Sequence, residues 1–370
     1  EETLMKKKAV RLIIVFALLA VLIAVLFIVM KLTKKEETPQ KEPESVSQAE
    51  VADIEGLTYR CESSGGEEVS LVRENGIWYY EKDRDFPLDQ EYVTNTMVKT
   101  AAQAAANKTI ENPSDDLASY GLDNPVLTIT LKKITGDTVT MNIGSYNESV
   151  EGYYLKVDGD SNIYLVNGEL VFGFDMTIYE LADKEDFPLV ETTSFTHIKI
   201  ERPDSVIEFK GEIEEDAETY ISQKDYVEKV KTWKMSDNGS VYRTCSQDKV
   251  QELIQLMSGY DYESMAVYHA TAEERSSDKY GFGASKTVLT VDYEVLDETT
   301  ARQVQGEGGI NEIVCDTIQK QYVLEIGAKV PENGYDDPAY YVSLADSDVI
   351  YTMTADMLDS IVNMDAKDYR

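Results

Sequence analysis

Residues 120–131 read YGLDNPVLTITL, and residues 280–293 read YGFGASKTVLTVDY. Each stretch opens with Tyr-Gly, which suits a turn because glycine accepts a positive φ at little cost. Each then continues into a short run rich in β-branched residues, which is typical of a strand. The two tyrosines lie 160 residues apart. We therefore expect one structural unit to occur twice in this chain.

Further matches follow these two stretches in the same order. NIG at residues 142–144 matches EIG at 325–327, GYYL at 152–155 matches AYYV at 339–342, and IY at 163–164 matches IY at 350–351. The first of these pairs is offset by 183 residues and the other two by 187. The step from 160 to 183 predicts an insertion of about 23 residues in the second copy, near residues 296–318.

The resemblance between the copies extends upstream to a tryptophan and a helix. The only two tryptophans, Trp78 and Trp233, each end a strand-like stretch. Asp89 can cap a helix with apolar residues at Val93, Met97, Ala101 and Ala104, and Ser246 can cap one with Val250, Leu253, Ile254 and Met257. A short helix is expected to close each copy, near residues 168–174 and 355–362.

These elements predict an α+β fold with mainly antiparallel pairing, because the links between strands look too short for crossovers. The first α+β repeat is expected at residues 53–186 and the second, with its insertion, at 194–370. Phe187-Pro188-Leu189 is expected to form the joint between them.

Residues 12–30 read LIIVFALLAVLIAVLFIVM, without a charged residue, proline or glycine. A helix of this length spans about 28 Å, close to the hydrocarbon thickness of a bilayer. The stretch is too long for a cleaved secretory signal and has no small-residue cleavage site. We expect a transmembrane signal anchor, with a short basic cytoplasmic flank at residues 1–11.

The regions on either side of the anchor suggest a location. Residues 31–52 are charged and polar with two prolines, which is typical of a flexible linker. A short N-terminus before a long folded portion favours an N-terminus inside the cell. We expect a single-pass protein of the bacterial cytoplasmic membrane, with residues 36–370 extracytoplasmic.

The charge of the chain argues against nucleic acid as a partner. Its 370 residues include 69 acidic and 35 basic ones, a net charge of -34. Residues 1–35 hold seven of the basic residues and two of the acidic ones, so the remainder carries -39. A surface this acidic repels phosphate backbones.

A family resemblance follows from these motifs. A single membrane helix, a tryptophan-ended hairpin, a helix and YGL-x-x-P from Tyr120 to Pro125 resemble a bacterial family called domain of unknown function 4340. The following strand, the IG step at 143–144 and the YY strand at 153–154 continue the pattern, which covers most of residues 53–370. The second copy departs from it, because it reads YGFG at 280–283 and lacks the proline.

The resemblance implies a role as well as a fold. Members of that family are similar in being envelope proteins, often encoded beside ABC-transporter permeases and gliding-motility-type auxiliary proteins. The resemblance implies no catalytic residues. An ABC-transporter permease or an auxiliary envelope protein is therefore the expected partner, besides the membrane itself at residues 12–30.

Motifs for catalysis are missing from the sequence. The two histidines, His197 and His269, lie near no GxSxG or reactive-cysteine motif. Cys61, Cys245 and Cys315 form no CxxC and no metal-ligand spacing, and they leave room for one disulfide bond. We expect no enzyme and no cofactor, and we assign no catalytic, cofactor-binding or metal-ligating residue.

Other polar stretches have simpler structural interpretations. Residues 158–162 (DGDSN) and 346–348 (DSD) could hold calcium, but their composition also suits hairpin turns, and neither completes a calcium loop. The glycines at 305–309 favour a flexible tip over a phosphate loop. The acidic run at 212–218 favours a solvated hairpin or loop.

Tyrosine is the most informative residue type for binding. The chain has 24 tyrosines and 9 phenylalanines, and tyrosine suits both half-buried sheet faces and interfaces. In the pairs at 79–80, 153–154 and 340–341, one ring is expected to point outward because neighbours on a strand face opposite sides.

Three functions compete on this basis. The leading hypothesis is a non-enzymatic, membrane-anchored interaction protein, accessory to an ABC-type transport complex of the cell envelope. The second is a ligand-binding or sensory module for wall glycan, peptide or calcium. The third is an envelope hydrolase with an acidic pair, for which the sequence nominates no residue.

Overall fold

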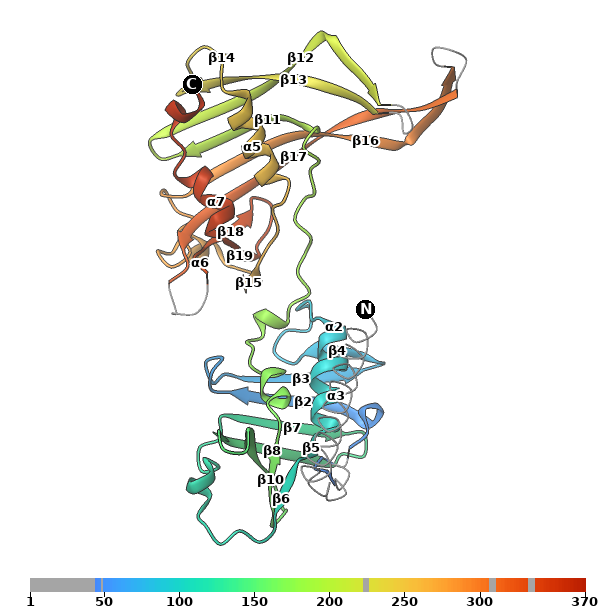
Figure 1. Ribbon diagram of the computed structural model, residues 1–370, viewed down its shortest axis with the longest axis vertical. Helices are drawn as coiled ribbons and strands as arrows, with labels where there is room; N and C mark the ends of the chain where they lie inside the picture. The colour runs from blue at the N-terminus through green and yellow to red at the C-terminus, as the bar shows by residue number, and fades with distance from the viewer. Residues whose placement is uncertain (1–43, 48, 222–225, 306–310, 332–336) are drawn as a thin grey trace, which may run out of the picture.

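The computed structural model describes residues 44–47, 49–221, 226–305, 311–331 and 337–370. Within these ranges, two antiparallel sheets form two lobes that lie end to end along the long axis (Figure 1). The expected α+β class is confirmed in this form: two mainly antiparallel sheets with few helices. No helix in the described ranges is long and apolar enough to span a membrane, and residues 12–30 lie outside them.

The first lobe contains a sheet with the order β4-β3-β2-β7-β8-β9-β10-β6 in its described residues. Its strands are β2 (Ile54–Cys61), β3 (Glu68–Glu74), β4 (Ile77–Tyr80), β6 (Lys108–Ile110), β7 (Leu127–Lys133), β8 (Thr138–Asn147), β9 (Gly152–Val157) and β10 (Ile163–Val166). A separate pair joins β1 (Glu44–Ser45) to β5 (Ala105–Ala106).

The second lobe contains a sheet with the order β14-β13-β12-β11-β16-β17-β18-β19-β15, again counted over the described ranges. Its strands are β11 (Phe195–Arg202), β12 (Ser205–Ile221), β13 (Tyr226–Asp237), β14 (Arg243–Thr244), β15 (Ser264–Val267), β16 (Thr287–Gln305), β17 (Asn311–Lys329), β18 (Ala339–Leu344) and β19 (Ile350–Thr354).

The two sheets follow the same path. Strands β11, β12 and β13 correspond to β2, β3 and β4, β15 corresponds to β6, and β16 to β19 correspond to β7 to β10. Only β14, at the edge, has no counterpart in the first sheet among the described strands. Tyr120-Gly121 and Tyr280-Gly281 therefore precede equivalent central strands, β7 and β16.

Helices cover one face of each sheet. In and beside the first lobe these are η1 (Val51–Asp53), α2 (Gln90–Tyr92), η2 (Val93–Val98), α3 (Lys99–Ala102), η3 (Leu117–Tyr120), α4 (Glu169–Phe172) and η4 (Tyr179–Leu181). The second lobe has α5 (Gln247–Met257), α6 (Ala272–Ser276), α7 (Ala355–Val362) and η5 (Ala366–Tyr369). The two expected closing helices are α4 and α7.

The predicted caps and apolar faces of the longer helices are confirmed. Asp89 accepts a hydrogen bond from the Tyr92 N–H, and Ser246 accepts one from the Lys249 N–H. All eight predicted apolar residues are buried. The first helix differs from the expectation because its centre, η2, is a π-helix and its last turn ends at Ala102, before Ala104.

The tryptophans were wrongly expected to end their strands. Trp78 lies within β4, and Trp233 lies within β13, which continues to Asp237. Each tryptophan N–H donates to a glutamine side chain, Gln90 at 2.8 Å and Gln247 at 2.8 Å, and each glutamine donates back to the tryptophan carbonyl. In each lobe these hydrogen bonds join the strand that carries the tryptophan to the N-terminus of the following helix.

The Tyr-Gly turns pack directly onto the sheets. Gly121 and Gly281 have φ of 67° and 75°, as expected for a left-handed turn position. The preceding carbonyl oxygens, of Tyr120 and Tyr280, lie so close to Gly144 and Gly327 that a Cβ there would be 2.2 Å and 2.0 Å away. The Ile-Gly pairs at 143–144 and 326–327 match between the two copies. They lie where the backbone of the Tyr-Gly turn closely approaches the neighbouring strand.

We predict that Gly144→Ala destabilises the protein by about 1–3 kcal/mol, because the turn backbone must shift to admit the methyl group. Thermal unfolding of the full-length protein in detergent should show a lower midpoint. Gly259→Ala is the control, since the nearest atom to its added Cβ is 3.6 Å away. Equal midpoints for the two variants would contradict this account of the turn.

Two long hairpins project from the second lobe on the same side (Figure 1). They are β12–β13 and β16–β17, and the latter is far longer than its counterpart β7–β8. Of the expected insertion, residues 296–305 and 311–318 lie in the outer part of β16–β17, and the acidic run at 212–218 lies within β12. The glycines at 306–309 lie outside the described residues.

The end of the expected flexible linker is not free, and that expectation needs correction. Glu44–Ser45 pairs with β5, and the Val46 N–H donates to the Ala104 carbonyl at 2.8 Å. Val46 is 6% exposed, and the Ser47 hydroxyl donates to the Ala102 carbonyl. One apolar side chain in a polar stretch thus docks the chain beside the end of α3.

The joint between the lobes is packed. Phe187 is 6% exposed, and its ring contacts Tyr260, Tyr262 and Tyr322 at centroid distances of 5.9, 5.3 and 5.2 Å. Lys184 donates to the carbonyls of Tyr262 and Glu263. On the other side, the Asp183 N–H donates to the Pro87 carbonyl at 2.7 Å. The connection is therefore fastened to both lobes.

A second contact joins the lobes directly. Tyr268, which follows β15, packs edge-on against Phe86 of the first lobe at 5.4 Å. Its hydroxyl donates to the Asp85 carbonyl at 3.0 Å. These contacts hold the two lobes in one elongated body.

We predict that Phe187→Ala lowers the free energy of unfolding by about 3–5 kcal/mol, because it leaves a cavity among three tyrosine rings. Leu189→Ala, two residues along, should cost little since Leu189 is 83% exposed. Denaturant unfolding of the two full-length variants measures the difference. A loss from Leu189→Ala as large as that from Phe187→Ala would show that the joint is not held by this core contact.

Candidate functional site: a cleft in the second lobe

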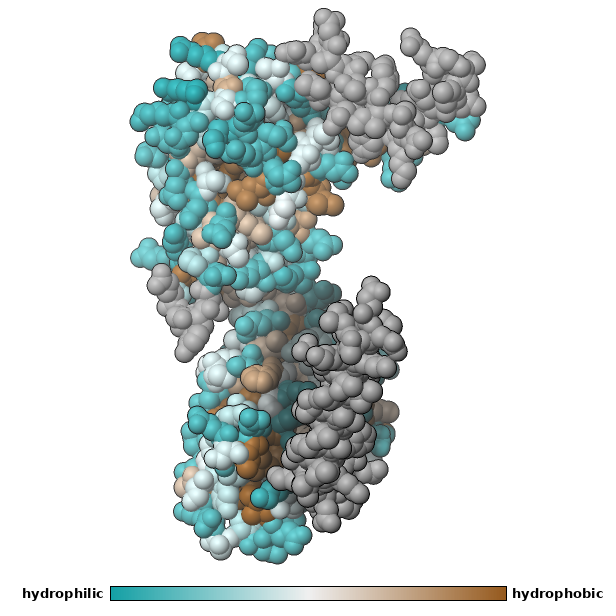
Figure 2. All heavy atoms as spheres, in the orientation of Figure 1, coloured by the Kyte–Doolittle hydropathy of each residue, from teal (hydrophilic) through white to brown (hydrophobic). Residues whose placement is uncertain are grey.

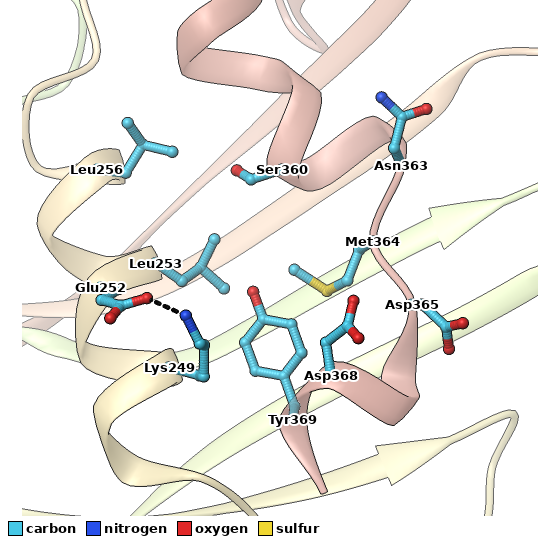
Figure 3. A pocket seen from close by; sticks show the side chains of 10 residues that line it. All are labelled: Lys249, Glu252, Leu253, Leu256, Ser360, Asn363, Met364, Asp365, Asp368 and Tyr369. Atoms are coloured by element: carbon cyan, nitrogen blue, oxygen red, sulfur yellow. Dashed lines mark hydrogen bonds and ion pairs between the residues drawn. The ribbon is translucent and has the colours of Figure 1, made fainter.

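A cleft of about 620 Å³ lies between α5, α7 and η5 (Figure 3). Helix α5 presents Val250, Leu253, Ile254 and Met257 toward the sheet, and α7 presents Leu358 and Ile361 to the same core. The chain then turns back at Asp365, which caps η5 by accepting from the Lys367 N–H. These three helices therefore leave a space between them on the surface of the lobe.

The floor of the cleft is apolar. Leu253, Leu256, Met364 and Tyr369 line it from α5, from the segment after α7 and from η5. Leu253 and Met364 are 3% and 5% exposed, so they belong to the core as well as to the cleft. Figure 2 shows hydrophobic residues grouped among hydrophilic ones on the face of the second lobe where α5 and α7 lie.

The rim of the cleft is acidic. Its ionisable residues are Lys249, Glu252, Asp365 and Asp368, which carry a formal charge of -2. The Lys249 ammonium binds the Glu252 carboxylate at 2.6 Å, and this hydrogen bond raises the pKa of Lys249. Within the described residues, no side chain forms a hydrogen bond or ion pair with the Asp368 carboxylate.

Tyr369 is a largely buried polar side chain of the cleft. It is only 9% exposed, and its ring packs on Phe209 at 5.0 Å. Its hydroxyl points into the space between Leu253 and Met364 (Figure 3) and has no hydrogen-bond partner in the described part of the chain. Burial, followed by the nearby charges of Asp368 and Glu252, raises the pKa of Tyr369, which keeps the hydroxyl protonated.

Sequence reasoning found the scaffold of this cleft but not the cleft. The buried face of α5 was predicted, whereas Asp365, Asp368 and Tyr369 were not singled out. The one signal in the sequence is the mixture of apolar and charged residues at 364–369 (MDAKDY). Without the fold, nothing indicates that this run faces α5.

The structure places the two histidines far apart, on different elements. His197 lies on β11, where its ring contacts Asp292 at 3.1 Å and Glu208 at 3.7 Å. Gln321 also donates to Asp292, at 2.6 Å, and Tyr242 donates to Glu208. His197 therefore contacts carboxylates on the outer face of the sheet, and these contacts are a structural reason for a histidine at this position.

His269 lies at the joint between the lobes. Its Nδ1 is 2.8 Å from Oδ2 of Asp348, and its ring lies tilted against that of Tyr268, with the centroids 3.9 Å apart. The hydrogen bond to Asp348, with further help from the charges of Asp83 and Asp85, raises the pKa of His269. Those last two aspartates belong to the first lobe, so the imidazolium charge favours the joined arrangement.

We predict that the joint is more stable at pH 6 than at pH 8. Because the folded pKa of His269 lies above its unfolded value of about 6.5, its contribution is present below that value and is lost as the pH rises through the folded pKa. The effect on the melting temperature should be about 1–2 °C, since both partners are half exposed. Asp348→Asn should remove this difference, and Asp346→Asn, an exposed neighbour in the same turn, should keep it.

The acidic stretches weighed for calcium are turns. Residues 158–162 connect β9 to β10, and residues 346–348 connect β18 to β19. Asp160 accepts from the Asn162 N–H at 2.9 Å and from the Tyr164 hydroxyl, and these bonds lower its pKa. In the described ranges, no group of three or more His, Cys, Asp or Glu side chains could hold a metal ion.

The tyrosine pairs meet the expectation only in part. Tyr79 is half-buried beside the buried Tyr80, whereas both Tyr153 and Tyr154 are half-buried. Tyr340 and Tyr341 are both buried, at 4% and 7% exposure, so no ring points outward there.

The cause is that both faces of β18 are covered. Tyr340 donates to Asp359 of α7 at 2.7 Å, and Tyr341 packs on Tyr280 at 5.0 Å. The three cysteines are free thiols, with Cys61 and Cys245 buried in different lobes.

The family resemblance is confirmed for the central part of the chain. Residues 78–239 match a family described as "Domain of unknown function (DUF4340)". The match begins at Trp78 and runs across the joint into β11–β13 of the second lobe. No curated protein matches the chain. No solved structure matches it either.

Proposed function

We propose that this chain is a non-enzymatic, membrane-anchored extracytoplasmic interaction protein, accessory to an ABC-type transport complex of the bacterial cell envelope. Residues 12–30 are its single-pass anchor, with the N-terminus inside and residues 36–370 outside. The apolar stretch at 12–30 supports the anchor, and the envelope role is what the resemblance to that family of unknown function implies.

The observation that carries the proposal is the pairing of two equivalent sheets in one rigid body. We infer that residues 53–186 and 194–370 are two copies of one unit, because their sheets share one strand order. Phe187 and Tyr268 fasten the copies together at the joint. A long body with two similar halves suits contact with an extended partner better than a single reaction.

The docked β1 strand sets how this body stands relative to the membrane. Because Glu44–Ser45 is bound to the first lobe, only residues 31–43 remain as tether. Thirteen residues reach at most about 45 Å. The first lobe is therefore held close to the bilayer, where the permease of a transport complex lies.

The projecting hairpins supply exposed apolar residues for a partner. Ile213 on β12 and Ile318 on β17 are 41% and 44% exposed, although isoleucine is usually buried. A two-stranded hairpin is only marginally stable by itself in water. Contact with another protein would stabilise these projecting arms.

The test is crosslinking in intact cells, affinity purification of the full-length protein and mass spectrometry. We predict recovery of a transporter permease or its auxiliary subunit. Ile318→Asp should reduce that recovery at least severalfold, because it places a charge in the contact. Ile134→Asp is the control, since Ile134 is 60% exposed on the first lobe. Failure to recover any membrane protein would contradict the proposal.

A second candidate function is a ligand-binding or sensory module. The cleft between α5, α7 and η5 favours it, because a concave site with an apolar floor and a few polar groups is typical of ligand pockets. Recovery of wall material and no membrane protein in the same experiment would support this alternative.

A further inference from the structure

We propose that the cleft between α5, α7 and η5 binds an extended segment of a partner protein that presents a Lys or Arg side chain beside an apolar residue. The inference rests on the proposed function, in that it takes the chain to bind other proteins. It adds the place of contact and the chemistry of the segment.

The apolar part of the segment is indicated by the floor. Leu253 and Leu256 come from α5 and Met364 from the segment after α7, and all three face one space. Covering apolar surface of this kind is favourable, at roughly 25 cal/mol for each Å² removed from water. Methionine adds adaptability, since its unbranched side chain fits ligands of varied shape.

The positive charge of the segment is indicated by the rim. Lys249 is already bound to Glu252 at 2.6 Å, and Asp365 has Lys367 at 3.5 Å. Asp368 forms no ion pair in the described residues, and the nearby Lys249, whose charge it feels, is already bound to Glu252. A Lys or Arg side chain would pair with Asp368, whereas an acidic segment would be repelled by a rim of charge -2.

The peptide character of the segment is indicated by Tyr369. Tyr369 as a residue is 9% exposed, and its hydroxyl faces the cleft and donates to no group in the described chain. A protonated hydroxyl at the floor of a cleft needs an acceptor, and a backbone carbonyl supplies one. An α-helix satisfies most of its own carbonyls, so an extended segment fits better than a helix.

The test measures binding of two probe peptides to the full-length protein in detergent. Fluorescein-labelled Ala-Leu-Lys-Leu-Ala and Ala-Leu-Glu-Leu-Ala are compared by fluorescence anisotropy at fixed salt. We predict that the lysine peptide binds at least tenfold more tightly than the glutamate peptide. Added salt should weaken its binding, because part of the attraction is electrostatic.

Variants separate this cleft from the general acidity of the surface. Asp368→Asn should weaken lysine-peptide binding about fivefold, and Tyr369→Phe about threefold, with no loss of thermal stability from the latter because the hydroxyl has no internal partner. Asp356→Asn is the matched control. This exposed aspartate lies on α7 outside the cleft lining and carries the same charge.

Three results would overturn the inference. They are equal binding of the two peptides, equal weakening by Asp356→Asn and Asp368→Asn, and binding of wall muropeptides with no binding of the lysine peptide. This assay needs no partner from the cell. If one of these results is found while a permease is still recovered by crosslinking, the cleft is not the peptide site, and the proposed function is unaffected.

Discussion

The contact on which each lobe depends is the approach of a turn carbonyl to a glycine in the neighbouring strand. Tyr120 O lies against Gly144, and Tyr280 O against Gly327, with no room for a side chain at either place. The contact brings the Tyr-Gly turn onto the sheet, where the Tyr120 ring packs on Tyr154 at 4.9 Å and the Tyr280 ring on Tyr341 at 5.0 Å. The loop that leads into the central strand is fixed by this one constraint.

A second repeated device fixes the helices to the sheets. In each lobe a glutamine at the first helical position, Gln90 or Gln247, exchanges two hydrogen bonds with the backbone of a buried tryptophan. The helix N-terminus is thereby bound to the edge strand β4 in the first lobe and to β13, next to the edge strand, in the second. In the second lobe this device sets the position of α5, and α5 in turn forms one wall of the cleft.

The joint differs from a simple linker because aromatic side chains from both sides enter it. Phe187 fills a pocket of three tyrosines, Tyr268 reaches Phe86, and the backbone at Asp183 is bound to the first lobe. The net charge of -34 leaves the two lobes mutually repulsive. Apolar contact and main-chain hydrogen bonds must therefore outweigh that repulsion, and the His269 charge assists them.

Most of the local structure follows from the sequence alone. Runs of β-branched residues predicted the central strands, the caps at Asp89 and Ser246 predicted the helices, and glycine at Gly121 and Gly281 predicted the turns. Each of these depends on residues near in the chain. The family resemblance was also readable, since its motifs are these same structural positions. Three features could not be read from the sequence: the packing of Phe187 into the second lobe, the burial of both Tyr340 and Tyr341, and the docking of Val46. Each depends on a surface supplied by distant residues.

The cleft shows the same division. The sequence determined that α5 is amphipathic and that residues 364–369 mix apolar and charged side chains, but neither pattern specifies a neighbour. Only the tertiary structure brought Leu253 and Lys249 of α5 opposite Met364, Asp368 and Tyr369. The physical reason is that a binding site is a juxtaposition of side chains from separate elements, and long-range packing alone sets which elements meet.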